Sequence, residues 1–346
     1  MQVSVLGATG YTGIELVGLL RDHPRVELAL LASESFSGEN IAEVYPHLKD
    51  IVEIECQSFD VDRISRASDI VFTALPHGVS QDIIPGLLER DLTVIDLSGD
   101  YRYRSAETYE RWYQPHKSPE LMEEAAYGLT ELREEEIKNS RLIANPGCYP
   151  TASLLAVQPL LAEDLIEPEG IIIDAKSGVS GAGRGASRIT HFCEVQENFK
   201  AYSVGCHRHS SEISEKLKIW NREEAEITFT PHLLPLKRGI LATIYADSAV
   251  RSAGDELREK ILKTYKDYYD HRPFLRIFAD RNPQLKYVTG TNFCDLSANA
   301  DEKGRIVIIS AIDNLLKGAA GQAVQNMNAV CGWPEITGLD KTGSYI

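Results

Sequence analysis

The chain has 346 residues, 43% of them hydrophobic and 25% charged, which is ordinary usage for a folded globular protein and excludes a disordered chain. This length is too great for one small core, so two domains are expected. The 51 acidic residues outnumber the 36 basic ones and give a net charge of −15. So acidic a surface argues against nucleic acid or an anionic membrane as the main partner.

Cysteine usage and the start of the chain indicate a cellular compartment. The six cysteines are scattered and form no CxxC pair, which argues against a disulfide scaffold. The chain begins directly with an apolar strand pattern, without the features of a signal peptide. No stretch approaches the 18 apolar residues of a membrane span. We therefore expect a cytoplasmic protein with reduced thiols.

The first half of the chain alternates short apolar runs with helical patterns. Strands are predicted at residues 2–6, 26–32, 70–75, 93–97 and 141–144. One helix is predicted after the glycine cluster that follows the first strand, and another at residues 80–90. Strands that alternate with helices form a parallel sheet with right-handed crossovers. The fold class is therefore α/β, with a Rossmann-type parallel sheet expected over residues 1–147.

After residue 148 the pattern changes. Helices are predicted at residues 151–161 and 255–268, among strands at residues 171–175, 226–230, 239–246, 287–288, 294–299 and 305–311. This predicts an α+β domain with a mixed or antiparallel sheet over residues 148–313. A last helix is predicted at residues 314–330 and is expected to return to the first domain.

A glycine cluster follows the first predicted strand. Gly7, Gly10 and Gly13 form a G-x-x-G-x-x-G pattern just where the first helix begins. Glycine lets the backbone turn tightly and approach a pyrophosphate, and a helix N-terminus supplies N–H donors to it. The order strand, loop, helix favours a dinucleotide site over a plain tight turn.

The end of the second predicted strand gives opposing indications about the cofactor. An acidic residue about 20 positions after the glycines binds the ribose 2′-hydroxyl and repels a 2′-phosphate, so Glu34 favours NAD. Ser33 and Ser35 can donate to a phosphate and favour NADP. A charged side chain is about as often simply solvated, so at this point the choice stays open.

Cys148 follows Asn145-Pro146-Gly147 and precedes Pro150. Proline is favoured in the first turn of a helix, so Cys148 is predicted to lie just outside a helix N-terminus. That end of a helix favours an anion and lowers a thiol pKa, and its free N–H groups can hold an oxyanion. The position predicts a nucleophile, and the alternative is a buried structural cysteine.

A nucleophilic thiol needs an acid/base partner, and the densest basic cluster is His207-Arg208-His209. The two histidines have the i, i+2 spacing of a strand, and no cysteine or carboxylate completes a metal site with them, so no metal is expected. The glycine-rich segment at residues 177–185 can offer N–H groups to a phosphate or to nicotinamide. Its alternative interpretation is a flexible surface loop.

Asn145-Pro146-Gly147-Cys148-Tyr149-Pro150-Thr151 resembles the nucleophile motif of the type 1 N-acetyl-γ-glutamyl-phosphate reductases, a family similar to aspartate-semialdehyde dehydrogenase. Other stretches match that family in order along essentially the whole chain. They are residues 7–13, 45–48, 75–78, 127–131, 177–184, 207–209 and 314–321.

The resemblance implies NADPH-dependent reduction of N-acetyl-γ-glutamyl phosphate to N-acetylglutamate γ-semialdehyde and inorganic phosphate, in arginine biosynthesis. Cys148 would form a thioester with the acyl group. His209 is the first choice for the acid/base, with His207 as the alternative. The resemblance also implies a homo-oligomer, either a dimer or a tetramer.

The resemblance further implies residues that bind the substrate and the cofactor. Those expected at the anionic substrate are Arg102, Arg184, Arg208, Ser180 and Asn145. Those expected at NADP(H) are Gly7, Ala8, Thr9, Gly10, Tyr11, Thr12, Gly13, Ser33, Ser35, Leu75, Pro76, His77, Gly181, Asn314 and Gly318. The structural alternative for Asn314 is that it caps the last helix.

Two other functions compete with this interpretation. One is reduction of a different acyl phosphate, either aspartyl phosphate or the carrier-bound aminoadipyl phosphate of lysine biosynthesis. The other is a non-catalytic regulatory protein that binds a dinucleotide tightly and has an unreactive Cys148. Glu34 departs from the basic residue expected at that position in the family.

Overall fold

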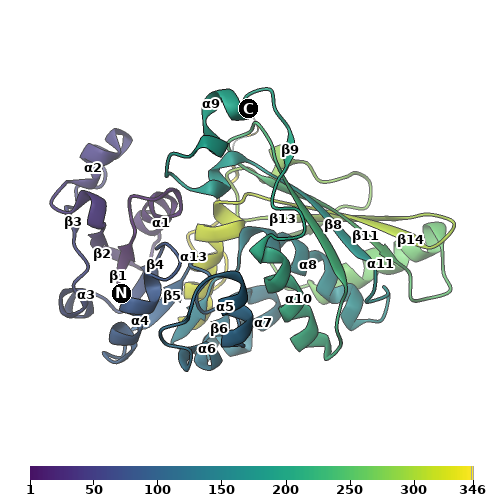
Figure 1. Ribbon diagram of the computed structural model, residues 1–346, viewed down its shortest axis with the longest axis horizontal. Helices are drawn as coiled ribbons and strands as arrows, with labels where there is room; N and C mark the ends of the chain where they lie inside the picture. Colours follow the sequence, from purple (N-terminus) through teal and green to yellow (C-terminus); the bar gives the residue numbers. More distant parts are fainter. Residues whose placement is uncertain (344, 346) are drawn as a thin grey trace. The chain divides into compact units, whose positions relative to one another are not determined.

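The computed structural model describes residues 1–343 and residue 345, and it divides into two compact units (Figure 1). The first unit contains residues 1–146 and 319–340. The second contains residues 147–318 and the described residues after Asp340. Within residues 1–343 and 345, no helix combines the length and apolar character needed to cross a membrane.

The first unit is built on a seven-stranded parallel sheet in the order β3-β2-β1-β4-β5-β7-β6. Its strands are β1 (Gln2–Leu6), β2 (Glu27–Ala32), β3 (Cys56–Gln57), β4 (Ile70–Thr73), β5 (Thr93–Asp96), β6 (Ala126–Tyr127) and β7 (Leu142–Ala144). All four residues of β4 are buried, as expected for a parallel strand covered on both faces. The predicted Rossmann-type sheet is confirmed, and its strand order reverses between β1 and β4, where such sheets bind ligands.

The helices of the first unit are α1 (Tyr11–Arg21), α2 (Ile41–Val44), α3 (Val61–Ala67), α4 (Ser80–Leu88), α5 (Ala106–Trp112), α6 (Leu121–Glu124), α7 (Thr130–Lys138) and α13 (Gly321–Val330). Helix α13 contacts α1, α7 and β5. Its buried amides are satisfied there: Thr130 Oγ1 donates to Asn326 Oδ1 at 2.7 Å and Gln325 Nε2 donates to Glu131 Oε1 at 2.8 Å. Buried polar groups need such partners.

The second unit holds a seven-stranded mixed sheet in the order β12-β13-β14-β11-β8-β10-β9. Pairing is parallel at β12–β13 and β8–β10 and antiparallel elsewhere, so the predicted mixed sheet is confirmed. The strands are β8 (Ile171–Ser177), β9 (Lys200–Ala201), β10 (Ile227–Leu233), β11 (Ile240–Asp247), β12 (Leu275–Ile277), β13 (Cys294–Ala300) and β14 (Arg305–Ile312).

Helices cover one face of this mixed sheet. Helix α8 (Cys148–Ala162) packs on β11 and β14, flanked by α10 (Arg208–Asn221) and α11 (Gly254–Tyr268) (Figure 1). Alternate residues of β8 and β11 are buried toward the helices, while the residues between them stay partly exposed. The shorter helices of this unit are α9 (Phe192–Val195) and α12 (Leu285–Val288).

Two local predictions are wrong. Residues 287–288 belong to the one-turn helix α12 rather than to a strand, because both the amide and the hydroxyl of Thr289 donate to the Leu285 carbonyl and close the turn. His207 and His209 do not lie on a strand either, because His209 lies in helix α10 and His207 is its N-cap. The buried face of α10 has helical spacing, but three of its five positions are polar: His209, Glu212, Ile213, Lys216 and Leu217.

Candidate active site

The glycine loop between β1 and α1 has the shape that a dinucleotide needs. Gly7 has a φ of +81°, and a Cβ there would overlap the Ala74 carbonyl oxygen. A Cβ on Gly13 would overlap the Gly7 carbonyl oxygen in the same way. Gly10 is the N-cap of α1, and a Cβ on it would meet only the Gly7 oxygen, at 3.5 Å. The first amides of α1 therefore face a compact backbone cradle that fits a pyrophosphate.

The residues after β2 are tied to their surroundings. The hydroxyls of Thr9 and Ser33 share a hydrogen bond of 2.7 Å, and both side chains are buried. Glu34 Oε1 accepts the Phe59 N–H at 2.7 Å, which anchors this carboxylate to the segment before α3. Ser35 lies in the short 3-10 turn Glu34–Phe36 and is exposed. Glu34 thus has a structural partner that the sequence did not indicate.

The loops after β4 and β5 are joined by a buried carboxylate. Asp100 accepts the Gly78 N–H at 2.8 Å with one oxygen and the Tyr109 hydroxyl at 2.7 Å with the other. His77, which follows Leu75 and Pro76 in the β4 loop, accepts the Gly99 N–H at 2.8 Å. These bonds fix the predicted cofactor-binding residues 75–77 to the loop that carries Arg102.

Arg102 is oriented by backbone carbonyls. Its Nε donates to the Asn145 carbonyl at 2.8 Å and its Nη2 to the Leu97 carbonyl at 2.9 Å, and the residue is 6% exposed. Asn145 Nδ2 in turn donates to the Ala319 carbonyl at 3.2 Å. The structure therefore brings together Arg102 and Asn145, two residues expected at the substrate.

A second buried carboxylate supports the base of the same loop. Asp96 accepts hydroxyl hydrogen bonds from Thr73 at 2.7 Å and from Ser98 at 2.6 Å. Burial, with a further contribution from the nearby Asp100, raises the pKa of Asp96. The pair Asp96 and Asp100 organises the loop and was not singled out from the sequence.

Cys148 is the first residue of helix α8, one position further into the helix than predicted, and Gly147 is the N-cap. The Gly147 N–H donates to Glu212 Oε1 at 2.9 Å, and Glu212 is completely buried. A Cβ on Gly318 would lie 2.8 Å from Cys148 Cβ, so the chain at Gly318 passes directly beside the thiol-bearing residue. The half-buried Cys148 thiol is thus held at a helix N-terminus.

Aromatic rings gather beside Cys148. The ring of Tyr149 lies 5.6 Å from that of His207 and 5.8 Å from that of His209. Its hydroxyl oxygen lies 3.0 Å from that of Tyr202. Burial is the main reason that the pKa of both phenols is raised, that of Tyr202 to about 12, so both remain proton donors at neutral pH. The histidine cluster and the cysteine segment, 60 residues apart in the sequence, therefore meet in one place.

The two histidines differ in their surroundings. His207 Nδ1 accepts the His209 N–H at 3.1 Å and so caps α10. Burial, helped by the neighbouring Arg208, lowers the pKa of His207 to about 4. His207 is therefore neutral at pH 7, with its proton on Nε2. His209 is buried in the first turn of the same helix, three positions before Glu212.

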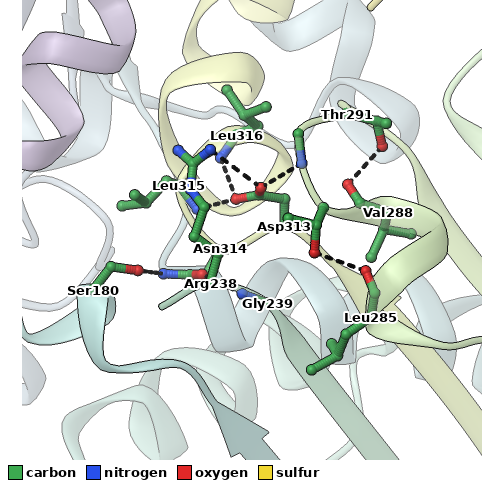
Figure 2. Close-up of polar contacts among 12 residues, drawn as sticks. Ser180, Arg238, Gly239, Leu285, Val288, Thr291, Asp313, Asn314, Leu315 and Leu316 are labelled. Carbon is green, nitrogen blue, oxygen red and sulfur yellow. Dashed lines mark hydrogen bonds and ion pairs between the residues drawn. The ribbon is translucent and has the colours of Figure 1, made fainter. Parts of the chain in front are cut away.

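The glycine-rich loop is held by the turn before the last helix. Ser180 and Gly181 lie in the 3-10 turn Val179–Ala182. Asn314 donates from Nδ2 to Ser180 Oγ at 3.0 Å and accepts the Gly239 N–H at 2.7 Å (Figure 2). Helix α13 begins at Gly321 with Ala320 as its N-cap, after the π-helical turn Leu316–Ala320, so the expectation that Asn314 caps a last helix at residues 314–330 is wrong. Asp313 Oδ1 accepts the Leu315 and Leu316 amides in the turn that precedes these segments. Arg184 and Arg208 are exposed.

Glu212 and Asp313 are the partners that the sequence interpretation missed near Cys148. Glu212 follows His209 by three positions, a spacing that would have marked it once α10 was recognised as a helix. Asp313 directly precedes Asn314, the first residue of the segment 314–321 that resembles the family. Both residues are carboxylates in the sequence, but their partners, Gly147 for Glu212 and Gly290 for Asp313, could not be predicted because they lie in other parts of the chain.

Comparison with known proteins agrees with these features. Residues 2–140 match the family described as semialdehyde dehydrogenase, NAD binding domain, and residues 148–314 match semialdehyde dehydrogenase, dimerisation domain. Proteins named N-acetyl-gamma-glutamyl-phosphate reductase are similar over their full length. That of Acetivibrio thermocellus is 49% identical over 99% of each chain. That of Desulforudis audaxviator is 51% identical over 100% of this chain and 99% of the relative.

Solved structures share the fold at low identity. Aspartate semialdehyde dehydrogenase II from Vibrio cholerae, complexed with ASA, has a TM-score of 0.73 at 19% identity, covering 96% of this chain and 98% of that one. Aspartate semialdehyde dehydrogenase with NADP from Candida albicans has a TM-score of 0.69 at 16% identity, covering 95% and 98%. The chain therefore belongs to the semialdehyde dehydrogenase family, and within it to the N-acetyl-γ-glutamyl-phosphate reductases.

Proposed function

We propose that the chain reduces N-acetyl-γ-glutamyl phosphate with NADPH to N-acetylglutamate γ-semialdehyde and inorganic phosphate, in arginine biosynthesis, through a thioester on Cys148. The relatives that carry this enzyme name are about half identical to the chain over their full length. The observation that carries the covalent route is Cys148 at the start of α8 beside the histidine pair. We assign cofactor binding to the first unit, and acyl transfer and dimerisation to the second.

Cys148 is the nucleophile of the first step. The N-terminal end of α8 favours the thiolate form, since the helix dipole stabilises a negative charge there. The thiolate Sγ attacks the carbonyl carbon of the acyl phosphate, and the bond from that carbon to the phosphate oxygen breaks. Phosphate leaves with the electron pair, and an acyl thioester remains on Sγ. The amides at the start of α8 are positioned to stabilise the carbonyl oxygen as it becomes negative.

His209 is the acid/base. It accepts the Sγ proton before attack and stabilises the oxyanion of the later hemithioacetal, whose collapse releases the aldehyde and restores the thiolate. His207 is less suited to this task, because its Nδ1 is already used as the cap of α10 and its low pKa makes it a weak proton acceptor. This supports the choice of His209 over His207.

NADPH, when bound, supplies the hydride that reduces the thioester. The backbone of residues Gly7 to Gly13 holds its pyrophosphate in this proposal, with Ala8, Thr9, Tyr11 and Thr12 lining the same loop. Ser33 and Ser35 lie at the end of β2, where a 2′-phosphate is bound in this kind of fold. The Glu34 carboxylate is anchored to Phe59 N–H, which supports a structural role for it and a site that accepts NADPH.

Arg102 is the main substrate-binding cation in this account. Two of its guanidinium nitrogens are fixed by carbonyls, which preorganises the side chain for an anionic group. Arg184, Arg208, Ser180 and Asn145 are further candidates for the phosphate and the carboxylate of the substrate.

We also propose that the chain is a homo-oligomer, a dimer or a tetramer, that assembles through the open face of the mixed sheet. That face carries Ile172, which is 39% exposed, together with Tyr245 and His232. The match to a dimerisation domain over residues 148–314 supports this assignment. The cytoplasm is the expected location, since reduced thiols are typical there and the six cysteines, all of them among the described residues, form no disulfide.

The reverse reaction tests the proposed function. The chain is mixed with N-acetylglutamate γ-semialdehyde, phosphate and either NADP⁺ or NAD⁺, and the absorbance of reduced nicotinamide is followed. We expect phosphate-dependent reduction of NADP⁺, and none in a Cys148→Ala variant that still binds NADPH. Turnover of aspartate semialdehyde or of a carrier-bound aminoadipate semialdehyde instead would assign another substrate. Cofactor binding without any turnover would identify a regulatory protein.

A further inference from the structure

Residues 45–48, one of the stretches that resemble the family, have no part in the proposed chemistry. Tyr45 is the C-cap of helix α2 and precedes the short 3-10 turn Pro46–Leu48. Its half-buried side chain reaches the glycine loop between β1 and α1, where the hydroxyl donates to the Thr9 carbonyl at 2.9 Å. A contact over 36 positions thus joins this stretch to the loop that fits a pyrophosphate.

The backbone that carries Tyr45 is anchored at the β3 edge of the parallel sheet (Figure 1). The Gly38 N–H donates to the Cys56 carbonyl at 2.8 Å, and the Ile41 N–H donates to the Ile54 carbonyl at 3.0 Å. Ile41 is fully buried, and its carbonyl accepts the Tyr45 N–H at 2.8 Å. The Tyr45 hydroxyl is therefore presented to the glycine loop from a fixed base.

The bond from Tyr45 fixes a peptide group in the glycine loop. The Thr9 carbonyl accepts the Tyr45 hydroxyl, and at the other end of that peptide the Gly10 N–H donates to the Gly7 carbonyl at 3.1 Å. Since a trans peptide is planar, two bonds at its opposite ends set its orientation. The Thr9 hydroxyl also shares a hydrogen bond of 2.7 Å with Ser33 at the end of β2. Thr9 is therefore held both through its side chain and through its carbonyl.

The peptide that Tyr45 holds leads directly into helix α1. Gly10 is the N-cap of α1, and the Ile14 N–H makes a bond of 2.9 Å to the Gly10 carbonyl. The amides just before Ile14, at residues 11–13, are the ones that bind an anion at a helix start. Donors that are already oriented cost less ordering when a ligand binds. The Tyr45 bond therefore preorganises the start of α1 for a pyrophosphate.

We propose that Tyr45 is a positioning residue for NADP(H): its hydroxyl holds the Thr9 carbonyl and thereby orients the amides at the start of α1 that bind the pyrophosphate. The pyrophosphate is the same in NADPH and NADH, whereas only NADPH carries a 2′-phosphate. Tyr45 should therefore contribute equally to the affinity for both dinucleotides and not to the choice between them. This role rests on the cofactor binding assigned to the glycine loop in the proposed function, but on none of the steps at Cys148.

Tyr45→Phe tests this role, because it removes the hydroxyl and keeps the ring. The dissociation constants of NADPH and NADH, both measured by nicotinamide fluorescence, should each rise about fivefold, the size expected for one hydrogen bond. The ratio of the two constants should stay unchanged. The kcat at saturating NADPH should also stay unchanged, since the hydroxyl acts on cofactor binding and not on the chemical steps.

Tyr269→Phe is the matched control. The Tyr269 hydroxyl donates to the Leu155 carbonyl at 2.7 Å in the second unit, so this variant loses the same kind of bond outside the cofactor-binding unit. It should unfold at a lower urea concentration, with both dissociation constants unchanged. Unchanged affinity of folded Tyr45→Phe for both dinucleotides would overturn the proposal. A loss confined to NADPH would also overturn it, because it would assign Tyr45 to the 2′-phosphate. Since the titrations need no acyl phosphate, a chain without turnover would disprove the proposed reaction and still allow this test.

Discussion

At the scale of single residues, the two histidines next to Cys148 have separate tasks. His207 caps α10 through Nδ1, and asparagine is among the best residues at that position. His207→Asn should therefore retain most of the activity. His209→Asn should lower kcat by about 10²–10⁴-fold, the usual contribution of a general acid/base. Steady-state kinetics of both variants decide this, and the reverse pattern would exchange the two assignments.

The burial of neutral His207 makes stability depend on pH. Its pKa is about 4 in the folded chain, below the ordinary value of 6.5, so the unfolded chain binds more protons between these values. Stability should therefore be complete above pH 6.5 and fall as the pH decreases toward 4. Urea unfolding at pH 7 and pH 5 checks this. The loss should be smaller in His207→Asn, whose cap does not titrate, and an equal loss in both would contradict the account.

Removal of Glu212, which is buried and accepts the Gly147 N–H, should destabilise the second unit. Glu212→Ala leaves the Gly147 N–H buried without its acceptor, which costs about 1–3 kcal/mol. It also frees the start of α8 and should lower kcat. Glu212→Gln keeps an oxygen acceptor for the Gly147 N–H, so its free energy of unfolding and its kcat should both be close to those of the unaltered chain. If Gln is as damaging as Ala, the charge of Glu212 matters rather than its hydrogen bond.

At the scale of elements, two glycines of the loop between β1 and α1 are needed for different reasons: Gly13 for folding and cofactor binding, and Gly10 for cofactor binding alone. Gly13→Ala forces a Cβ into the Gly7 carbonyl and should lower the free energy of unfolding as well as NADPH affinity. Gly10→Ala has space for its Cβ and an ordinary extended backbone, so the variant should fold normally. It should nevertheless bind NADPH weakly, because the methyl group stands where the pyrophosphate approaches. Unfolding and NADPH titration of both variants test this, and normal NADPH binding by Gly10→Ala would place the pyrophosphate elsewhere.

Most strands were predictable because their apolar runs are short and bounded by polar turns, as in β4 and β14. Helix α10 was not, because its buried face includes His209, Glu212 and Lys216, which a hydrophobic pattern cannot recognise. Helix α12 was predicted as a strand because a single helical turn has too few residues to show the 3.6-residue periodicity of apolar side chains. These failures concern polar or very short segments near the site.

At the scale of the whole molecule, local sequence patterns predicted both sheets. They also predicted the glycine loop as the cofactor-binding segment and Cys148 as the nucleophile. The contacts that complete the site were beyond prediction, because they join residues far apart in the sequence. Glu212 and Gly147 are 65 positions apart, and Asn314 and Ser180 are 134 apart. Such contacts depend on the strand order of the mixed sheet in the second unit, and the strand order cannot be predicted from the pattern of any single segment.

The open face of that mixed sheet leads to a prediction about assembly. Ile172 on β8 is 39% exposed there, and burying it between two copies would stabilise an oligomer. Ile172→Asp should therefore shift the molar mass measured by light scattering toward that of a single chain. Ile219→Asp, an exposed position on α10, serves as the control. An unchanged mass for Ile172→Asp would place the interface on another surface.

The central claim is that the acyl group passes through a thioester on Cys148, and mass spectrometry tests it most directly. The chain is mixed with N-acetyl-γ-glutamyl phosphate without NADPH, quenched in acid and digested. We predict an N-acetylglutamyl adduct on the peptide that contains Cys148, its loss when NADPH is added before the quench, and no adduct in Cys148→Ala. Absence of the adduct, together with turnover by Cys148→Ala, would contradict the account.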